Sequence, residues 1–252
     1  GDDILVFQNA NGYPSTISNR LPAQNYIFAG DGADTMRMIT ALTTNDFIDG
    51  GIGDDKLTIQ GSTTLSQLNK VINIETIKIE NNAASTITTA DSLVAANQKL
   101  FVDGTALTSS SLNWNGSAET NGAFSILGGG GNDSISGSAG NDTIFGGSEN
   151  DTISGNAGND SITGGAGDDT LTGDAGNDSF NIDLGTDTIA DFKVGEDNLS
   201  VTLGATAILS VYERGGLLDL RAITAIQNAG TIRVTATTPS IISTTASTSI
   251  YG

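Results

Sequence analysis

The chain has 252 residues, a formal net charge of −19, 33 glycines, and neither cysteine nor histidine. The acidity argues against direct binding of nucleic acid, which needs basic patches, and the lack of cysteine excludes disulfides. No apolar run reaches about 18 residues, so no transmembrane segment is expected. Aromatic residues form 5% of the chain, which suits a narrow solenoid better than a globular core.

Residues 1–60 contain imperfect copies of a nine-residue pattern. Its marks are glycine at positions one and four, aspartate at position six and an apolar residue at position eight. Residues 1–6 fit positions four to nine, so we expect the chain to begin within a repeat, as a fragment would. The copies at 29–37, 41–49 and 50–58 place Asp34, Asp46 and Asp55 at position six. We expect this cluster to bind at least one cation; the alternative is a decayed repeat that keeps its shape without metal.

Residues 61–127 lose the pattern but keep strand-like alternation. Alternating apolar and polar residues occur at 73–80, 99–103 and 111–114, which predicts strands. Residues 64–71 and 90–98 are expected to form short helices. Trp114, the one tryptophan, is expected to lie in the core, the alternative being a platform for a carbohydrate. No linker separates this segment from the next, which favours one continuous stack.

Residues 128–181 are six consecutive blocks of nine without insertion: GGGGNDSIS, GSAGNDTIF, GGSENDTIS, GNAGNDSIT, GGAGDDTLT and GDAGNDSFN. Such a period indicates a repeat architecture. Position six is Asp133, Asp142, Asp151, Asp160, Asp169 and Asp178. Position eight is Ile135, Ile144, Ile153, Ile162, Leu171 and Phe180. A flexible Gly/Ser/Asn linker would need neither column.

The columns predict a coil built from two blocks. Positions seven to nine form a short strand with position eight facing inward, and glycine allows the turns. Asp133, Asp151 and Asp169 then line one edge, while Asp142, Asp160 and Asp178 line the other. The six blocks hold nine acidic residues and no Lys or Arg, so the carboxylates repel one another. Calcium, which takes six to eight oxygen ligands with tolerant geometry, is expected to resolve this conflict; magnesium is the weaker candidate, and zinc or copper would want nitrogen or sulfur.

The six blocks resemble the nonapeptide G-G-x-G-x-D-x-U-x of RTX (repeats-in-toxin, hemolysin-type) proteins. The resemblance implies a parallel β-roll that holds Ca²⁺ between turns of one edge, in a protein secreted by a type I machine. The six aspartates would be the side-chain ligands. Backbone carbonyls of the turn glycines would complete the sites: Gly129, Gly131, Gly140, Gly147, Gly158, Gly165, Gly167 and Gly176. Glu149 departs from the pattern at position four, and it would either distort that turn or add a carboxylate.

Residues 182–252 are expected to close the solenoid as a β cap, with strands near 208–212, 217–220 and 231–235. The stretches 187–192 and 195–199 resemble the segment that commonly follows RTX repeats. Asp187 is expected to supply a calcium ligand at this end. Asp183, Asp191 and Asp197 are expected to be solvated turn residues, the alternative being further calcium ligands of an end site. From Val234 onward the chain carries no charge; this tail would be part of an export signal, an outer strand or a join to another domain.

The sequence therefore predicts an all-β fold: a parallel β-roll, that is a calcium-binding β-solenoid, with flanking irregular β segments and a C-terminal β cap. We expect four segments: divergent repeats at 1–60, a β-rich solenoid segment at 61–127, the six-repeat roll at 128–181 and the cap at 182–252. Without histidine or cysteine, zinc-protease, Ser-His-Asp and thiol chemistry are excluded. No G-x-S-x-G elbow is present, and nothing marks a pair of carboxylates for glycoside hydrolysis. No catalytic residues are expected.

Two functions remain. The first is a structural segment of a secreted bacterial surface-layer or cell-surface protein, which folds on calcium and self-associates in a surface lattice. The second is a calcium-dependent adhesin or a module that binds bacterial cell-surface polysaccharide. A narrower version, ice binding, is disfavoured because position three holds Gly, Ala or Ser rather than a row of Thr.

Overall fold

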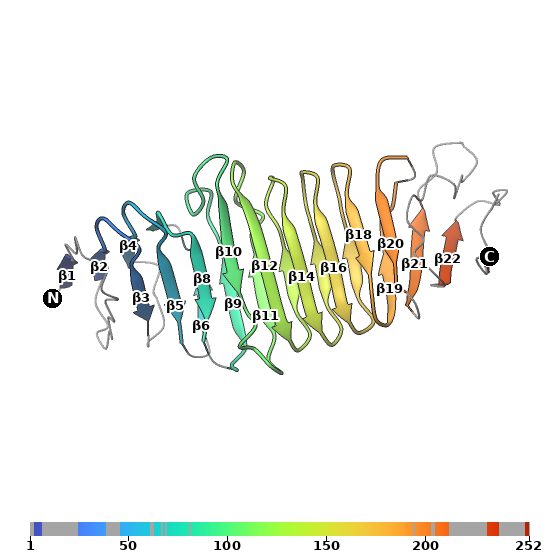
Figure 1. Cartoon of the computed structure of the whole chain (residues 1–252), viewed down its shortest axis with the longest axis horizontal. Coiled ribbons are helices and arrows are strands. Elements are labelled where there is room, and N and C mark those ends of the chain that lie inside the picture. Colours follow the sequence, from blue (N-terminus) through green and yellow to red (C-terminus); the bar gives the residue numbers. More distant parts are fainter. Residues whose placement is uncertain are drawn as a thin grey trace.

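The structure is a computed structural model and describes residues 3–6, 25–38, 46–60, 63–66, 68, 70–80, 82–193, 195–202, 205–211, 231–236 and 250–251. The chain forms a β-solenoid of about eight turns. Its strands stack side by side along the long axis, with β1 (Asp3–Val6) and β22 (Thr231–Ala236) at opposite ends (Figure 1). In the described part no residue is helical, and accordingly no helix there is suited to crossing a membrane. The expected all-β, parallel fold is confirmed.

Two long parallel sheets form the faces of the solenoid. The nine-stranded sheet contains, in order, β20 (Asn198–Val201), β18 (Ser179–Ile182), β16 (Ser161–Ala166), β14 (Thr143–Ser148), β12 (Ala123–Gly130), β10 (Lys99–Asp103), β8 (Thr76–Ile79), β5 (Lys56–Ile59) and β3 (Thr35–Met38). The ten-stranded sheet contains β23 (Ile250–Tyr251), β22, β21 (Thr206–Val211), β19 (Thr186–Ile189), β17 (Thr170–Thr172), β15 (Thr152–Ser154), β13 (Ser134–Ser136), β11 (Leu112–Asn115), β9 (Ser85–Thr88) and β6 (Thr63–Ser66).

A third, four-stranded sheet is confined to the N-terminal coils. It contains β1, β2 (Asn25–Phe28), β4 (Phe47–Asp49) and β7 (Val71–Ile72). The chain passes in turn through β4, β5 and β6, and then through β7, β8 and β9. These coils are therefore three-sided, and the solenoid narrows to two sides from β10 onwards, before the regular nonapeptides begin.

The strand register explains why residues 61–127 do not show the nonapeptide. Lys56 pairs with Thr76, Thr76 with Phe101, and Phe101 with Ser125, so these coils are longer than two nonapeptides and unequal in length. Ser125 pairs with Thr143, and from there up to Ser179 each coil consists of two nonapeptides. Longer turns leave the stacked strands in register, and the same sheets continue without interruption through both kinds of coil.

The core is a single column between the sheets. The six position-eight residues are at most 2% exposed, as their alternation with polar neighbours predicts. Trp114 is 1% exposed and packs edge-to-face on Phe124 with ring centroids 5.4 Å apart. The expectation that Trp114 lies in the core is therefore correct, and it cannot act as a surface platform for sugars.

The prediction of two short helices in the central segment is wrong. Thr64 to Ser66 belong to β6, which pairs with β9, and residues 90–98 form turns. Leu93 and Val94 are buried within these turns, so their apolar spacing reflects contact with the core rather than a helical face. The strands expected near 208–212 and 231–235 correspond to β21 and β22. The strand expected at 217–220 and most of the uncharged tail lie outside the described residues.

Candidate metal centre

One edge of the roll carries a series of buried aspartates, which we call the first ladder: Asp133, Asp151, Asp169 and Asp187. The backbone N–H of Asp133 donates to Oδ1 of Asp151 at 2.7 Å. Asp151 and Asp169 repeat this contact to the next rung at 2.8 and 3.0 Å. One oxygen of each carboxylate thus joins its coil to the preceding one.

The opposite edge carries the second ladder: Asp142, Asp160, Asp178 and Asp197. The corresponding N–H to Oδ1 distances are 2.8, 2.9 and 3.0 Å. All six repeat aspartates therefore lie on the two edges to which their alternation between successive blocks assigns them.

The second carboxylate oxygen of most rungs has no partner. Oδ2 makes no hydrogen bond in Asp133, Asp151, Asp160, Asp169, Asp178 and Asp187. These six side chains are at most 3% exposed. Burial of an unpaired carboxylate oxygen is costly, and a cation bound at these edges would offset that cost.

The position-one glycines form a cradle for these oxygens. A Cβ placed on Gly128 would lie 2.2 Å from Oδ2 of Asp133 and 2.3 Å from the carbonyl oxygen of Gly146, one coil further on. At Gly146 it would lie 2.2 Å from Oδ2 of Asp151 and 2.6 Å from the carbonyl oxygen of Gly164. A carboxylate oxygen and a carbonyl oxygen of the next coil thus converge on one small volume, which any larger side chain would fill.

A family model described as the RTX calcium-binding nonapeptide repeat matches residues 38–58, 125–153, 145–180 and 154–189. These are RTX calcium-binding nonapeptide repeats. The matches contain Asp55 and every rung from Asp133 to Asp187. Their cofactor is Ca²⁺, as the resemblance implied. No curated protein and no solved structure matches the chain.

The turn glycines predicted as carbonyl ligands allow close stacking of the RTX coils. Seven of the eight have positive φ, between 102° and 151°; they are Gly129, Gly131, Gly147, Gly158, Gly165, Gly167 and Gly176. A Cβ on Gly147 would lie 1.9 Å from the carbonyl oxygen of Gly129, and one on Gly165 would lie 2.0 Å from that of Gly147. Gly140 occupies the same kind of position below Gly158. The carbonyl oxygens of these turns therefore face along the stack towards the next coil.

The electrostatics of the ladders favour a bound cation. Burial, together with the neighbouring carboxylates of Asp133 and Asp169, raises the pKa of Asp151 to about 8, although the hydrogen bond from the Asp133 N–H lowers it. Burial likewise raises the pKa of Asp160 and Asp187 to about 7. A cation beside these carboxylates would reverse the shifts, because it stabilises the ionised form.

The N-terminal repeats contain a shorter ladder. The backbone N–H of Asp34 donates to Oδ1 of Asp55 at 2.7 Å, and that of Asp55 donates to Oε2 of Glu75 at 2.6 Å. Oδ2 of both aspartates is buried without a partner, and burial raises the pKa of Asp55 to about 6. Glu75 was not recognised in the sequence, because it belongs to a coil longer than two nonapeptides. Asp46 is also buried, at 5% exposure.

Two aspartates of the cap differ from the expectation of solvated turns. Asp197 is 5% exposed and forms the last rung of the second ladder, with Oδ2 accepting the N–H of Lys193 at 2.7 Å. Asp191 accepts the N–H groups of Gly173 and Asp174. Both carboxylates accept hydrogen bonds from backbone N–H groups of the preceding coil. Only the strand register shows that these residues lie side by side. Asp183 is half-buried.

Asp142 is the one predicted rung whose carboxylate is fully satisfied. Its Oδ2 accepts the N–H of Ser138 at 2.6 Å, the Ser138 hydroxyl contacts both oxygens, and Oδ1 accepts the N–H of Phe124. Asp142 begins its ladder, and Ser138 supplies the donors that the other rungs lack.

Position five forms another ladder that the sequence did not reveal. The side-chain Oδ1 of Asn132 accepts the N–H of Asn150 at 3.0 Å, and Asn150 in turn accepts that of Asp168 at 2.9 Å. Asn141 and Asn159 repeat the contact on the other edge. Asn in five of the six blocks at this position was the available signal. Glu149 keeps its turn by adopting φ 71°, and its side chain is exposed, so the turn is not broken.

The residues present fit calcium. All available donors on the edges are oxygens, which hard cations prefer. Among the described residues, no three acidic side chains converge on one point. A bound ion would therefore take one or two carboxylate oxygens and complete its shell from backbone carbonyls. Bound calcium supplies positive charge that neutralises the buried carboxylates.

Proposed function

We propose that the chain is a calcium-dependent structural segment of a secreted bacterial protein of surface-layer type. The observation that carries this proposal is the pair of ladders whose buried carboxylate oxygens have no partner within the protein. A β-roll of RTX repeats is a structural calcium-binding fold, and we propose that the segment is not catalytic.

We assign the calcium ligands to the two ladders. The side-chain ligands are Asp133, Asp151, Asp160, Asp169, Asp178 and Asp187, with Asp34 and Asp55 in the N-terminal repeats and Asp142 as the weakest member, since Ser138 already satisfies it. The turn glycines predicted from the sequence contribute carbonyl oxygens. Gly146, Gly164 and Gly173 are added as carbonyl ligands, because their carbonyl oxygens converge with the unpaired Oδ2 atoms of Asp133, Asp151 and Asp160, respectively.

The proposed mechanism is folding driven by extracellular calcium. An ion that binds only the folded chain stabilises it by mass action, and here it also removes the repulsion along each ladder. In the cytoplasm, where calcium is scarce, the chain would stay unfolded and suited to export by a type I machine. Outside the cell it would fold into one stack made of the four segments 1–60, 61–127, 128–181 and 182–252.

A surface-layer role is supported by the shape and the surface. The stack is long and narrow (Figure 1), and outward positions of the RTX strands are mostly Ser and Thr, such as Ser134, Thr143, Thr152 and Thr170. A rod of this kind places calcium along both edges, where ions shared between neighbouring molecules would hold a lattice.

Sedimentation velocity with excess calcium, and again with a chelator, tests the proposal. We expect an extended, high-friction monomer in chelator and a compact rod that grows into larger species in calcium. A compact monomer in calcium without growth would retain calcium-driven folding but reject the lattice. Identical behaviour in both conditions would reject the proposal as a whole.

The second candidate is an adhesin or polysaccharide-binding module. It is favoured by one observation: an exposed aromatic ring in a surface groove beside a group of basic residues, neither of which was evident in the sequence.

A further inference from the structure

The outer face of the nine-stranded sheet carries a group of basic residues. Arg37, Lys56, Lys78 and Lys99 lie at outward positions of β3, β5, β8 and β10, where they alternate with buried apolar residues. They are four of the ten basic residues in a chain of net charge −19. The same four strands hold one acidic residue, Asp103. This concentration is the reverse of the charge of the molecule as a whole.

The register aligns these residues with an apolar region on the neighbouring strands. One row across β3, β5, β8, β10, β12 and β14 reads Arg37, Thr58, Lys78, Asp103, Leu127 and Phe145. The adjacent row reads Thr35, Lys56, Thr76, Phe101, Ser125 and Thr143. With strands about 4.8 Å apart, each row spans about 24 Å. A basic half and an aromatic, hydroxyl-bearing half therefore form one continuous surface.

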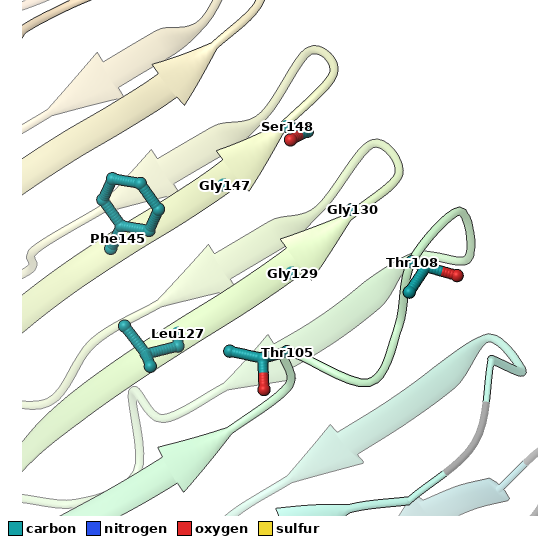
Figure 2. A pocket seen from close by; sticks show the side chains of 8 residues that line it. All are labelled: Thr105, Thr108, Leu127, Gly129, Gly130, Phe145, Gly147 and Ser148. Atoms are coloured by element: carbon teal, nitrogen blue, oxygen red, sulfur yellow. The ribbon is translucent and has the colours of Figure 1, made fainter.

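The apolar half contains a groove of about 440 Å³, within the range of small-ligand sites. It is lined by Thr105, Thr108, Leu127, Gly129, Gly130, Phe145, Gly147 and Ser148. Figure 2 shows the Phe145 ring and Leu127 standing on the same face of adjacent strands, with Thr105 beside Leu127. Phe145 is 39% exposed. The lining has apolar surfaces and hydroxyl groups but no charge.

The basic residues are only partly neutralised. Arg37 pairs with Glu80 at 2.9 Å, and Lys78 lies 4.0 Å from Asp103. Within the described ranges, no carboxylate forms an ion pair with Lys56 or Lys99, and the Lys99 ammonium donates to the hydroxyl of Thr143 at 3.1 Å. Two cationic side chains on the same face of the sheet as the groove, Lys99 on β10 and Lys56 two strands further away on β5, are therefore available to an anionic ligand.

We propose that this face, from Lys56 to Phe145, binds an anionic polysaccharide that carries carboxylate groups. The C–H face of a sugar ring stacks on Phe145 and Leu127, its hydroxyls bond Thr105 and Thr108, and carboxylates further along the polymer meet Lys56, Lys78 and Lys99. This assignment deepens the second candidate function and does not depend on the calcium ligands.

Charge complementarity selects this occupant. A neutral glycan would leave Lys56 and Lys99 without counterions, whereas a nucleic acid, with a phosphate at every nucleotide, would be repelled by the acidic edges of the roll. An anionic bilayer would present no rigid ring to the groove. A sugar polymer with widely spaced carboxylates satisfies both halves of the surface.

Fluorescence polarisation of the full chain in excess calcium tests the proposal, with labelled oligosaccharides of hyaluronan and of heparosan as probes, each of which carries one carboxylate per disaccharide. Uncharged dextran, oligo-dT and anionic lipid vesicles are the comparison ligands. We expect at least one carboxylated probe to bind in a salt-sensitive manner, and dextran and oligo-dT to bind at least about tenfold more weakly. Calcium-induced stabilisation of each variant, measured separately, shows that it is folded.

Two variants test the basic half and the apolar half of the surface separately. Lys56→Ala with Lys78→Ala should weaken binding about fivefold, whereas Lys70→Ala, which lies just before β7 of the third sheet, should have no effect. Phe145→Ala should weaken binding by a similar factor, and Leu184→Ala, an exposed apolar residue outside the groove, should not. Binding of neither carboxylated probe, equal binding of dextran or oligo-dT, preference for vesicles, or unchanged binding by both surface variants would each overturn the proposal.

Discussion

Replacement of Asp151 by asparagine should have opposite effects with and without calcium. Asp151 is 2% exposed, its Oδ1 accepts the N–H of Asp133, and its Oδ2 has no partner. Asparagine keeps the Oδ1 acceptor and puts an amide donor near the carbonyl oxygen of Gly164. The calcium-free variant should therefore be more stable than the parent, while its stabilisation by calcium should be smaller.

The magnitude follows from the shifted pKa. The pKa of Asp151 rises from 3.8 to about 8. The folded state therefore binds a proton that the unfolded state releases above pH 3.8, and the stability of the parent falls as pH rises from about 4 to about 8. At about 1.4 kcal/mol per pH unit this sets a ceiling of about 4 kcal/mol at pH 7. Water that reaches the edge of the calcium-free roll screens the charge, so we expect a gain of about 2 kcal/mol.

Urea denaturation of parent and variant, in chelator and in calcium, at several pH values, measures both effects. Asp168→Asn is the matched control: Asp168 is exposed in the corresponding turn of the next coil, and asparagine already occupies this position in the other five blocks. The control should leave the response to calcium unchanged. The reasoning is refuted if Asp151→Asn destabilises the calcium-free protein at pH 7, or if it keeps the full calcium response.

Two further substitutions test the core and the cradle, and one fluorescence measurement tests the central coils. Ile153→Ala should cost about 2 to 4 kcal/mol by urea denaturation in calcium and in chelator alike, and a loss seen only in calcium would contradict its role as core. Gly164→Ala places a Cβ 2.0 Å from Oδ2 of Asp169, so calorimetric titration should show fewer calcium ions bound; an unchanged stoichiometry would reject the cradle. The fluorescence of Trp114 should stay blue-shifted in chelator, because we expect the central coils to remain folded without calcium: the Glu119 carboxylate there already accepts three backbone N–H groups. Fluorescence typical of a water-exposed tryptophan would show that these coils also require calcium.

The ends of each ladder show where sequence reasoning stops. One coil before the first rung of each ladder, Leu112 and Phe124 occupy the position that an aspartate holds in the repeats. Their backbone N–H groups donate to Oδ1 of Asp133 and Asp142, but their side chains provide no carboxylate. Glu75 and Asp197 extend ladders across coils of irregular length. None of these four residues is marked by the nonapeptide, since the local pattern is absent or shifted around them.

The basic residues of the nine-stranded sheet could likewise not be grouped from the sequence alone. Lys56, Lys78 and Lys99 follow one another at unequal intervals that match no repeat, and no local motif joins them. They share a face because each lies within a strand whose alternation turns it outward, and because successive coils return to the same sheet.

The sequence by itself determined the all-β coil, the buried column from Ile135 to Phe180, the two edges of aspartates and the need for a hard cation. It could do so because a strict period of nine residues determines which side chains face inward and which residue, two blocks away, is stacked next to each of them. Tertiary structure decided the additional rungs, the role of Ser138 beside Asp142, the position-five ladder and the groove at Phe145. These depend on register between coils of unequal length, and register is set by the stacking of whole strands, which no local pattern encodes.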